Sequence, residues 1–150
     1  MNEAPTAGRI EDRVHLLPVR VYYEDTDFSG LVYHANYLKF FERGRSDFLR
    51  VSGVDHVALM AEDTAITVLS INVKFRTAAR IDDALVVRTS FDDLKGPRFI
   101  IGQTITRQGA PIADAAVEAC CISLAGRAKR APALLVDRIS PFLDPARSRF

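Results

Sequence analysis

The 150-residue chain contains no tryptophan, two cysteines, three histidines and no surplus of charge of either sign. Its 20 basic and 19 acidic side chains leave a net charge of +1, which argues against an electrostatic surface for nucleic acid. Cys120 and Cys121 are adjacent on a predicted strand, so their side chains point to opposite faces and cannot form a disulfide that stabilises the fold. We interpret both as small buried residues in a reducing compartment.

Long apolar runs are also missing, since none approaches the ~18 residues of a membrane-spanning helix. The first 13 residues are small and polar and lack the apolar segment of a secretory signal. We therefore expect a cytoplasmic protein. At 48% hydrophobic and 26% charged, the chain has the composition of one globular domain. We predict a flexible arm over residues 1–13, a folded domain over 14–135 and a tail over 136–150.

Early in the chain the spacing of hydrophobic residues changes from every second residue, as in a strand, to the spacing of a helix. The segment VRVYYE, residues 19–24, alternates and predicts a half-buried strand. Residues 36–50 predict the principal helix. Its buried face is expected to contain Tyr37, Phe40, Phe41, Gly44, Phe48 and Leu49. Glycine costs about 1 kcal/mol inside a helix, so we attribute Gly44 to close packing on a sheet.

After two helical turns predicted within residues 54–62, the period returns to two and short turns separate four long strands. The first of these, residues 65–76, is expected to place Leu69, Ile71, Val73 and Phe75 on one face. Because the connections are short, neighbouring strands are expected to be antiparallel. A short last helix is expected near residue 135. The pattern predicts an α+β fold in which a five-stranded antiparallel sheet wraps one long helix. Its uncovered edges favour self-association.

Between the first strand and the helix, residues 22–37 read YYEDTDFSGLVYHANY, with Glu24, Asp25 and Asp27 close together. A strand that leads into a helix places its last side chains beside the helix N-terminus, where free N–H groups favour negative charge. Such a corner can stabilise an acyl carbonyl oxygen as charge develops on it. A nearby carboxylate can attack that carbonyl or deprotonate a water. A carboxylate beside free N–H groups at a helix start is suited to hydrolysis of an activated acyl group.

Two other interpretations fit the same carboxylates. With His34 they could bind a divalent metal, but Glu24 and Asp25 are expected on opposite sides of a strand, and no histidine pair stands at ligand spacing. We therefore expect no metal. Alternatively, Asp25 and Asp27 are turn and capping residues. On the residues alone, capping is favoured over catalysis for either aspartate.

The stretch VRVYYEDTDFSGLVYHANYLKFFERGRSDFL closely resembles the signature of the hotdog-fold acyl-CoA thioesterases related to 4-hydroxybenzoyl-CoA thioesterase. More narrowly, it resembles their YbgC branch, which is associated with the Tol-Pal cell-envelope system. The resemblance extends over about residues 18–135, and its pattern Y-x-D-T-D-x-x-G-x-V-Y-H-x-N-Y is long and specific. It implies the hotdog fold and thioester hydrolysis with no cofactor except the coenzyme A of the substrate.

The resemblance assigns roles residue by residue. Asp27 matches the catalytic aspartate, which acts as nucleophile or general base. His34 matches the helix start, where a backbone N–H polarises the thioester carbonyl and the imidazole assists. The matching positions that shape the substrate pocket are Tyr23, Asp25, Gly30, Val32, Tyr33, Asn36 and Tyr37. Elsewhere, His15 and His56 are expected at the surface. The rings at positions 22, 23, 28, 33, 37, 40 and 41 are expected mostly in the core.

The implied substrate is an acyl-CoA, with acyl carrier protein as the alternative carrier. Its phosphates require basic residues. The sequence leaves a choice among Arg76, Arg80, Arg98 and the run Arg127, Lys129 and Arg130. The resemblance also implies a homo-oligomer, a dimer of dimers, that is cytoplasmic or peripheral to the inner membrane. The alternative function is a non-catalytic partner of the envelope or lipid machinery that binds acyl-CoA or acyl carrier protein. A third possible function is hydratase or dehydratase chemistry on the same fold.

Overall fold

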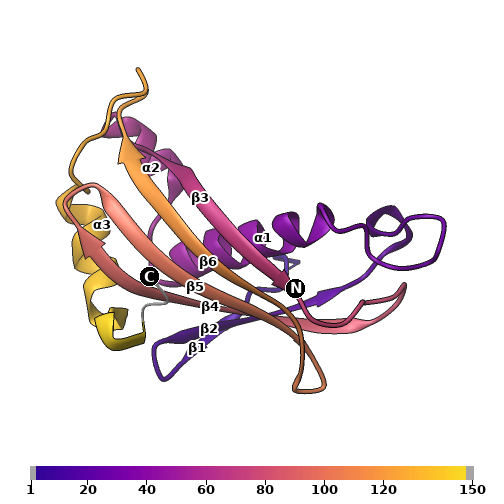
Figure 1. Cartoon of the computed structure of the whole chain (residues 1–150). Coiled ribbons are helices and arrows are strands. Elements are labelled where there is room, and N and C mark those ends of the chain that lie inside the picture. The colour runs from indigo at the N-terminus through magenta and orange to yellow at the C-terminus, as the bar shows by residue number, and fades with distance from the viewer. Residues whose placement is uncertain (1–2, 148–150) are drawn as a thin grey trace.

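The computed structural model describes residues 3–147, which form one antiparallel sheet with a long helix across one face (Figure 1). The strands are β1 (Arg9–Glu11), β2 (Val14–Arg20), β3 (Ala65–Phe75), β4 (Ala84–Lys95), β5 (Arg98–Arg107) and β6 (Ala110–Ile122), in the sheet order β1-β2-β4-β5-β6-β3. The helices are α1 (Asn36–Val51), α2 (His56–Ala61) and α3 (Ala133–Ile139). The predicted α+β hotdog fold is confirmed, with six strands instead of five.

The sixth strand comes from the segment predicted as a flexible arm. Strand β1 pairs with β2 through a two-residue hairpin at Asp12 and Arg13, which both have positive φ, at 48° and 67°. That is the conformation of a type I′ turn, which matches the twist of paired strands. Residues 1–2 of the predicted arm and 148–150 of the predicted tail lie outside the described residues.

The predicted strand at residues 19–24 is wrong in its second half. Strand β2 ends at Arg20, and Tyr23–Asp25 forms a short 3-10 turn. The cause is local, because the backbone N–H of Tyr22 donates to the Asp25 side chain at 2.8 Å and turns the chain out of the sheet. Two more 3-10 turns follow α3, at Ser140–Phe142 and Pro145–Arg147. None of the helices in the described range is long and apolar enough to cross a membrane.

The buried face of α1 is the one that the helical period predicts. Its buried residues are Tyr37, Phe40, Phe41, Gly44, Phe48 and Leu49. A Cβ atom at Gly44 would lie only 2.7 Å from Thr89 Oγ1 and 2.8 Å from Val87 Cγ1 on β4. The interpretation of Gly44 as a site of close helix–sheet packing is confirmed.

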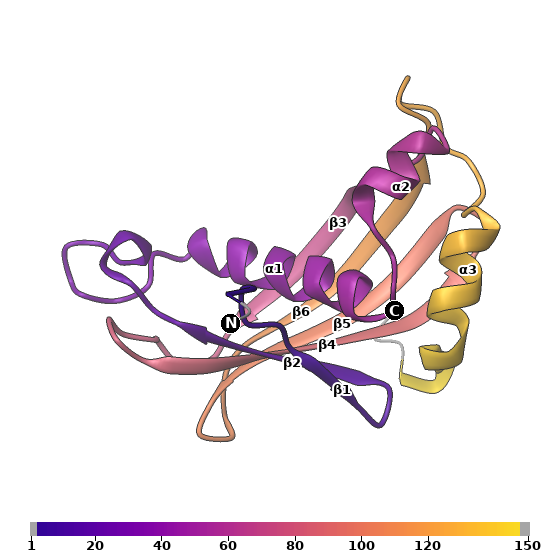
Figure 2. The ribbon, with the colours of Figure 1, turned by 180° about the vertical axis from the view of Figure 1, so that it is seen from behind.

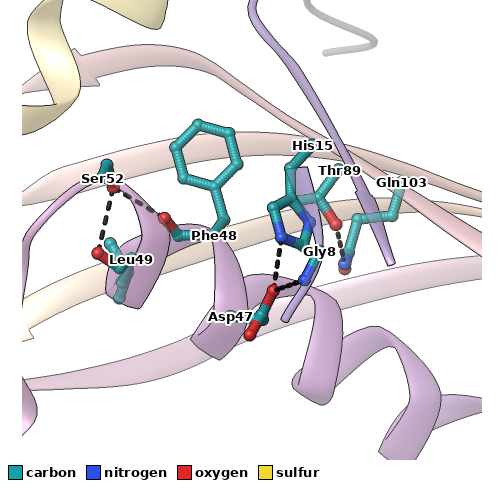
Figure 3. A network of polar contacts seen from close by, with 8 residues as sticks. All are labelled: Gly8, His15, Asp47, Phe48, Leu49, Ser52, Thr89 and Gln103. Atoms are coloured by element: carbon teal, nitrogen blue, oxygen red, sulfur yellow. Dashed lines mark hydrogen bonds and ion pairs between the residues drawn. The ribbon is translucent and has the colours of Figure 1, made fainter. Parts of the chain in front are cut away.

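His15 was predicted at the surface, and this is wrong, because its side chain is fully buried between β2 and α1. Its Nε2 lies 2.7 Å from Asp47 Oδ2 on α1, and the same oxygen accepts the backbone N–H of Gly8 at 2.8 Å (Figure 3). The sequence carries no local signal for this burial, since it arises where the N-terminal segment packs on α1. Burial lowers the pKa of His15, against the smaller raising effect of Asp47.

Strand β3 forms one edge of the sheet, and its outer edge has no partner strand within residues 3–147. Ile71 and Val73 pack against the core, as predicted. Phe75 lies on the same face, since its ring centroid is 5.6 Å from that of Tyr37 on α1, although its place at the end of the strand leaves 53% of its surface exposed. Leu69 does not follow the prediction, because it is 55% exposed and lies at a β-bulge between Val68 and Ser70, where the register shifts.

We expect Gly44→Ala to lower the free energy of unfolding by about 1–3 kcal/mol, because the added methyl group overpacks the contact with Thr89 and Val87. In an uncrowded helix interior the same change would raise stability by about 1 kcal/mol. Urea unfolding measures the difference. Lys39→Ala, at an exposed position of α1, is the control and should stay within about 0.5 kcal/mol of wild type. A stabilised Gly44→Ala variant would contradict the close contact.

We expect the protein to lose stability as the pH falls from about 7.5 to about 5, in part through His15. Its pKa is lowered in the folded state, so the unfolded chain binds more protons below about pH 6.5 and acid favours unfolding. Urea unfolding at the two pH values should show a smaller loss in His15→Gln than in wild type. His56→Gln, at an exposed histidine, should keep the wild-type loss. Equal losses in all three proteins would rule out His15 as a source.

Candidate active site

The loop between β2 and α1 carries the predicted site residues, at the end of the molecule away from α2 and α3 (Figure 2). Asp25 organises this loop from a buried position. Its carbonyl oxygen accepts the backbone N–H of Tyr33 at 3.0 Å and the side-chain amide of Asn36 at 2.9 Å. Asp25 and Asn36, which were predicted to shape the pocket, therefore hold the loop against the start of α1.

Asp27 closes a tight turn within that loop. Its Oδ1 accepts the backbone N–H of Ser29 at 2.8 Å and also the Ser29 hydroxyl. Its carbonyl accepts the N–H of Gly30, which has a φ of 77° that favours glycine. The two Ser29 contacts lower the pKa of Asp27. Oδ2 of Asp27 has no hydrogen-bond partner in the described chain, so the residue forms a turn and still presents a free carboxylate oxygen.

His34 lies two residues before α1, in the turn that starts the helix. No side chain caps this helix start, where Ala35 is the N-cap residue. The backbone N–H of His34 has no acceptor among residues 3–147, whereas its neighbour Tyr33 donates to Asp25. The His34 ring packs 4.6 Å from the Tyr33 ring and 6.3 Å from the Phe75 ring, between centroids. The helix start therefore offers an unused N–H donor.

The structure brings Asp27 and His34 into one pocket of about 300 Å³, called the Asp27 pocket here. Its other lining residues are Leu31, Val32, Tyr37, Phe75, Arg76, Thr77 and Ala78. The hydroxyl of Tyr37 accepts the backbone N–H of Ala79 at 3.0 Å and ties α1 to the segment after β3. Of residues 75–78, sequence reasoning named only Arg76, as one of several candidates for the phosphates, and it missed Phe75, Thr77 and Ala78 as site residues. The only signal for them was that they lie within residues 18–135, over which the family resemblance extends.

A second hollow of about 500 Å³ also borders Asp27, and we call it the Phe28 hollow. It is lined by Tyr23, Thr26, Asp27, Phe28, Gly30 and Ile81. Asp27 thus borders both spaces, and four of the seven predicted pocket residues divide between them, whereas Asp25, Tyr33 and Asn36 line neither. Val32 and Tyr37 belong to the Asp27 pocket, and Tyr23 and Gly30 belong to the Phe28 hollow.

The prediction that the loop aromatics lie mostly in the core is wrong for four of the seven. Tyr22, Tyr23, Phe28 and Tyr33 are exposed, and Phe28 is fully so. They project on a loop beyond the sheet, where no other part of the described chain covers them. Tyr37, Phe40 and Phe41, on α1, are buried as predicted.

Glu24 and Asp25 do not flank a strand, since both lie in the 3-10 turn, with Asp25 buried and Glu24 exposed. No three His, Cys, Asp or Glu side chains of the described residues gather as a metal-binding group. What the loop does assemble is a free carboxylate oxygen, an unused N–H at a helix start and partly apolar walls. This set can polarise a carbonyl group and deliver a nucleophile to it.

Comparison with known proteins places this chain in a family. The model of the thioesterase-like superfamily matches residues 21–147. The chain is 40% identical over 108 residues to acyl-CoA thioesterase YbgC of Haemophilus influenzae, which covers 71% of this chain and 79% of that protein. It is also 40% identical over 106 residues to acyl-CoA thioester hydrolase YbgC of Escherichia coli O157:H7, with coverages of 70% and 79%.

Solved structures agree. A "probable thioesterase" from Bartonella henselae matches with a TM-score of 0.76 at 40% identity, over 79% of this chain and 99% of that chain. Slr0204, a 1,4-dihydroxy-2-naphthoyl-CoA thioesterase from Synechocystis, matches with a TM-score of 0.78 over 85% of this chain and 96% of that chain. At 21% identity this match supports the fold alone. The chain belongs to the thioesterase-like superfamily.

Proposed function

We propose that this protein hydrolyses acyl-CoA thioesters to a free acid and coenzyme A in the Asp27 pocket. The observation that carries the proposal is the meeting of the Asp27 carboxylate and the His34 helix start in one pocket. Two relatives at 40% identity bear the names acyl-CoA thioesterase and acyl-CoA thioester hydrolase. The lowered pKa of Asp27 keeps its carboxylate ionised at neutral pH, as an attacking or deprotonating group must be.

In this mechanism the thioester carbonyl oxygen accepts the free N–H of His34, which stabilises the negative charge that develops there. Asp27 then removes a proton from a water that attacks the carbonyl carbon, or it attacks the carbon itself to give an anhydride that water hydrolyses. In both routes the carbon–sulfur bond breaks, the thiolate leaves, and the oxygen of water ends in the acid. The imidazole of His34 assists by orienting the water.

The acyl group is best placed in the Phe28 hollow, which Asp27 also borders. Its exposed aromatic side chains, Tyr23 and Phe28, offer apolar surface that an acyl chain or ring would cover. Val32 and Tyr37 line the Asp27 pocket and shape the approach to the carbonyl carbon. Asp25, Tyr33 and Asn36 act as positioning residues through the hydrogen bonds that hold the loop.

A homo-oligomer, with dimers that pair into a tetramer, belongs to the same proposal. The free outer edge of β3 is 11 residues long, and exposed apolar side chains, Val68 and Leu69 among them, lie along it. Such an edge is a ready site for strand pairing, and a second copy is the occupant that we propose. A cytoplasmic location and a role beside the Tol-Pal system are part of this proposal and rest on the YbgC resemblance.

We expect Asp27→Asn to lower kcat for acyl-CoA hydrolysis by at least about 100-fold, since the amide can neither attack nor accept the proton. The measurement is release of free thiol from a panel of short, long and aromatic acyl-CoA substrates. Glu24→Gln, at an exposed carboxylate of the same loop, is the matched control and should keep wild-type turnover. If wild type binds the panel without turnover, the alternative of a non-catalytic binding partner replaces this proposal. Equal turnover by Asp27→Asn would remove Asp27 from the mechanism.

We expect Ser29→Ala to shift the acid limb of the kcat/KM profile to higher pH. The Ser29 hydroxyl is a leading cause of the lowered pKa of Asp27, so its loss raises that pKa and protonates the carboxylate earlier on acidification. Ser46→Ala removes a hydroxyl bonded to Glu42 on α1 and should leave the profile unchanged. An acid limb that stays in place in Ser29→Ala would show that a group other than Asp27 sets it.

A further inference from the structure

Arg76 borders a second cavity in addition to the Asp27 pocket. This cavity, the outer groove, has a volume of about 390 Å³ and lies on the face of the sheet opposite to α1. It is lined by Asn72, Lys74, Arg76, Asp114, Ala115 and Ala116. Because Arg76 is shared, the outer groove and the Asp27 pocket adjoin each other at the end of β3.

The strand register places the polar side chains of this groove together. Lys74 stands opposite Asp114 on β6, and Asn72 stands opposite Ala116. These side chains point away from the core, since the intervening Val73 packs against it. The small side chain of Ala116 leaves space on β6, and the longer side chains of Asn72 and Lys74 line this space from β3.

The outer groove carries a surplus of positive charge. Arg76 holds Asp114 Oδ2 with both Nε and Nη2, each at 3.0 Å. Lys74, directly across from the same carboxylate, makes no ion pair or hydrogen bond within the described chain. Two cations therefore share one anion, and Arg76 still has N–H donors to offer, because a guanidinium has five. An anionic ligand would find an uncompensated ammonium and a guanidinium already held in place.

Size requires a coenzyme A thioester to extend beyond the Asp27 pocket. About 300 Å³ is the lower end of the range, roughly 300–1,000 Å³, of pockets that enclose a drug-sized ligand. A CoA thioester is larger than such a ligand, and its far end is a nucleotide with three phosphate groups. With the acyl group in the Phe28 hollow, the pantetheine arm has to leave through the Asp27 pocket, which Arg76 lines.

We propose that the outer groove binds the phosphorylated nucleotide of coenzyme A, with Arg76 and Lys74 on the phosphates and Asn72 on a polar edge of the nucleoside. This assignment rests on the proposed function and adds the carrier that the substrate uses. It favours free coenzyme A over acyl carrier protein, whose pantetheine arm carries one phosphodiester and no nucleotide. Pairing of a second copy along β3 would use backbone groups and leave these outer side chains accessible.

The test compares two thioesters of the same acyl group, one on coenzyme A and one on N-acetylcysteamine, which ends before the phosphates. The double variant Lys74→Gln/Arg76→Gln should lower the ratio of kcat/KM for the CoA thioester to kcat/KM for the truncated thioester by about tenfold or more, mainly through KM. Thermal unfolding checks that the variant folds. An unchanged ratio would overturn the proposal, whether kcat/KM stays at the wild-type value or falls equally with both thioesters.

Arg98→Gln is the matched control. Arg98 pairs with Glu118 on the same face of the sheet at 2.7 Å, and the exposed fractions of the two side chains, 52% and 20%, are close to the 49% and 23% of Arg76 and Asp114. Its ratio should equal that of wild type. A fall in the ratio for Arg98→Gln, with none for the double variant, would move the phosphate site to Arg98.

A binding measurement separates this proposal from the proposed catalysis. Isothermal titration with adenosine 3′,5′-bisphosphate needs no turnover, and it should give binding by wild type that weakens about tenfold or more in the double variant. Binding without hydrolysis of any acyl-CoA would keep the nucleotide site and reject the enzyme. Hydrolysis of the CoA thioester, with equal nucleotide binding by wild type and double variant, would keep the enzyme and reject the site.

Discussion

The close contact of α1 with β4 at Gly44 is the constraint on which the rest of the structure depends. With Thr89 Oγ1 2.7 Å from the place of a missing Cβ, the helix sits closer to the sheet than a side chain would permit. Beneath it, buried Gln103 donates to the carbonyl of Phe41 at 2.8 Å and to the Thr89 hydroxyl at 2.9 Å. A buried amide must keep its partners, so α1 cannot slide along the sheet without leaving polar groups unsatisfied.

Because α1 is fixed in this way, so is its first turn, and the site forms around it. Tyr37 ties the helix start to Ala79 after β3, and Asn36 ties it to the carbonyl of Asp25 in the preceding loop. The loop before α1, the start of α1 and the segment after β3 therefore meet at one point. Asp27 bonds locally in its turn with Ser29 and Gly30, and the carbonyl of Gly30 accepts the N–H of Ile81 at 3.1 Å, which ties this turn to the segment after β3. A rigid frame thus holds the turn that carries the Asp27 carboxylate.

Much of this could be predicted from the sequence where the determinants are local. The buried face of α1, from Tyr37 to Leu49, follows from helical spacing alone. A long motif singles out Asp27, whose catalytic role stays a prediction. Errors occurred where burial depends on distant partners. His15 is buried because residues 8 and 47 enclose it, and Phe28 is exposed because no residue within 3–147 covers its ring. Phe75, Thr77 and Ala78 were missed as site residues because only the folded sheet brings them to His34.

The position of the site at the rim of the sheet also bears on its chemistry. In the single chain Asp27 is exposed and its pKa is lowered, which makes its carboxylate a weak base. A substrate or second copy that covers Tyr23, Phe28 and the β3 edge would remove water from the carboxylate. Desolvation raises the pKa of a carboxyl group, and so its basicity, and it strengthens the attraction between a developing oxyanion and its N–H donors. In the proposed mechanism the exposed aromatic surface and the outer edge of β3 therefore belong to the same arrangement as Asp27, because covering them would make its carboxylate a stronger base.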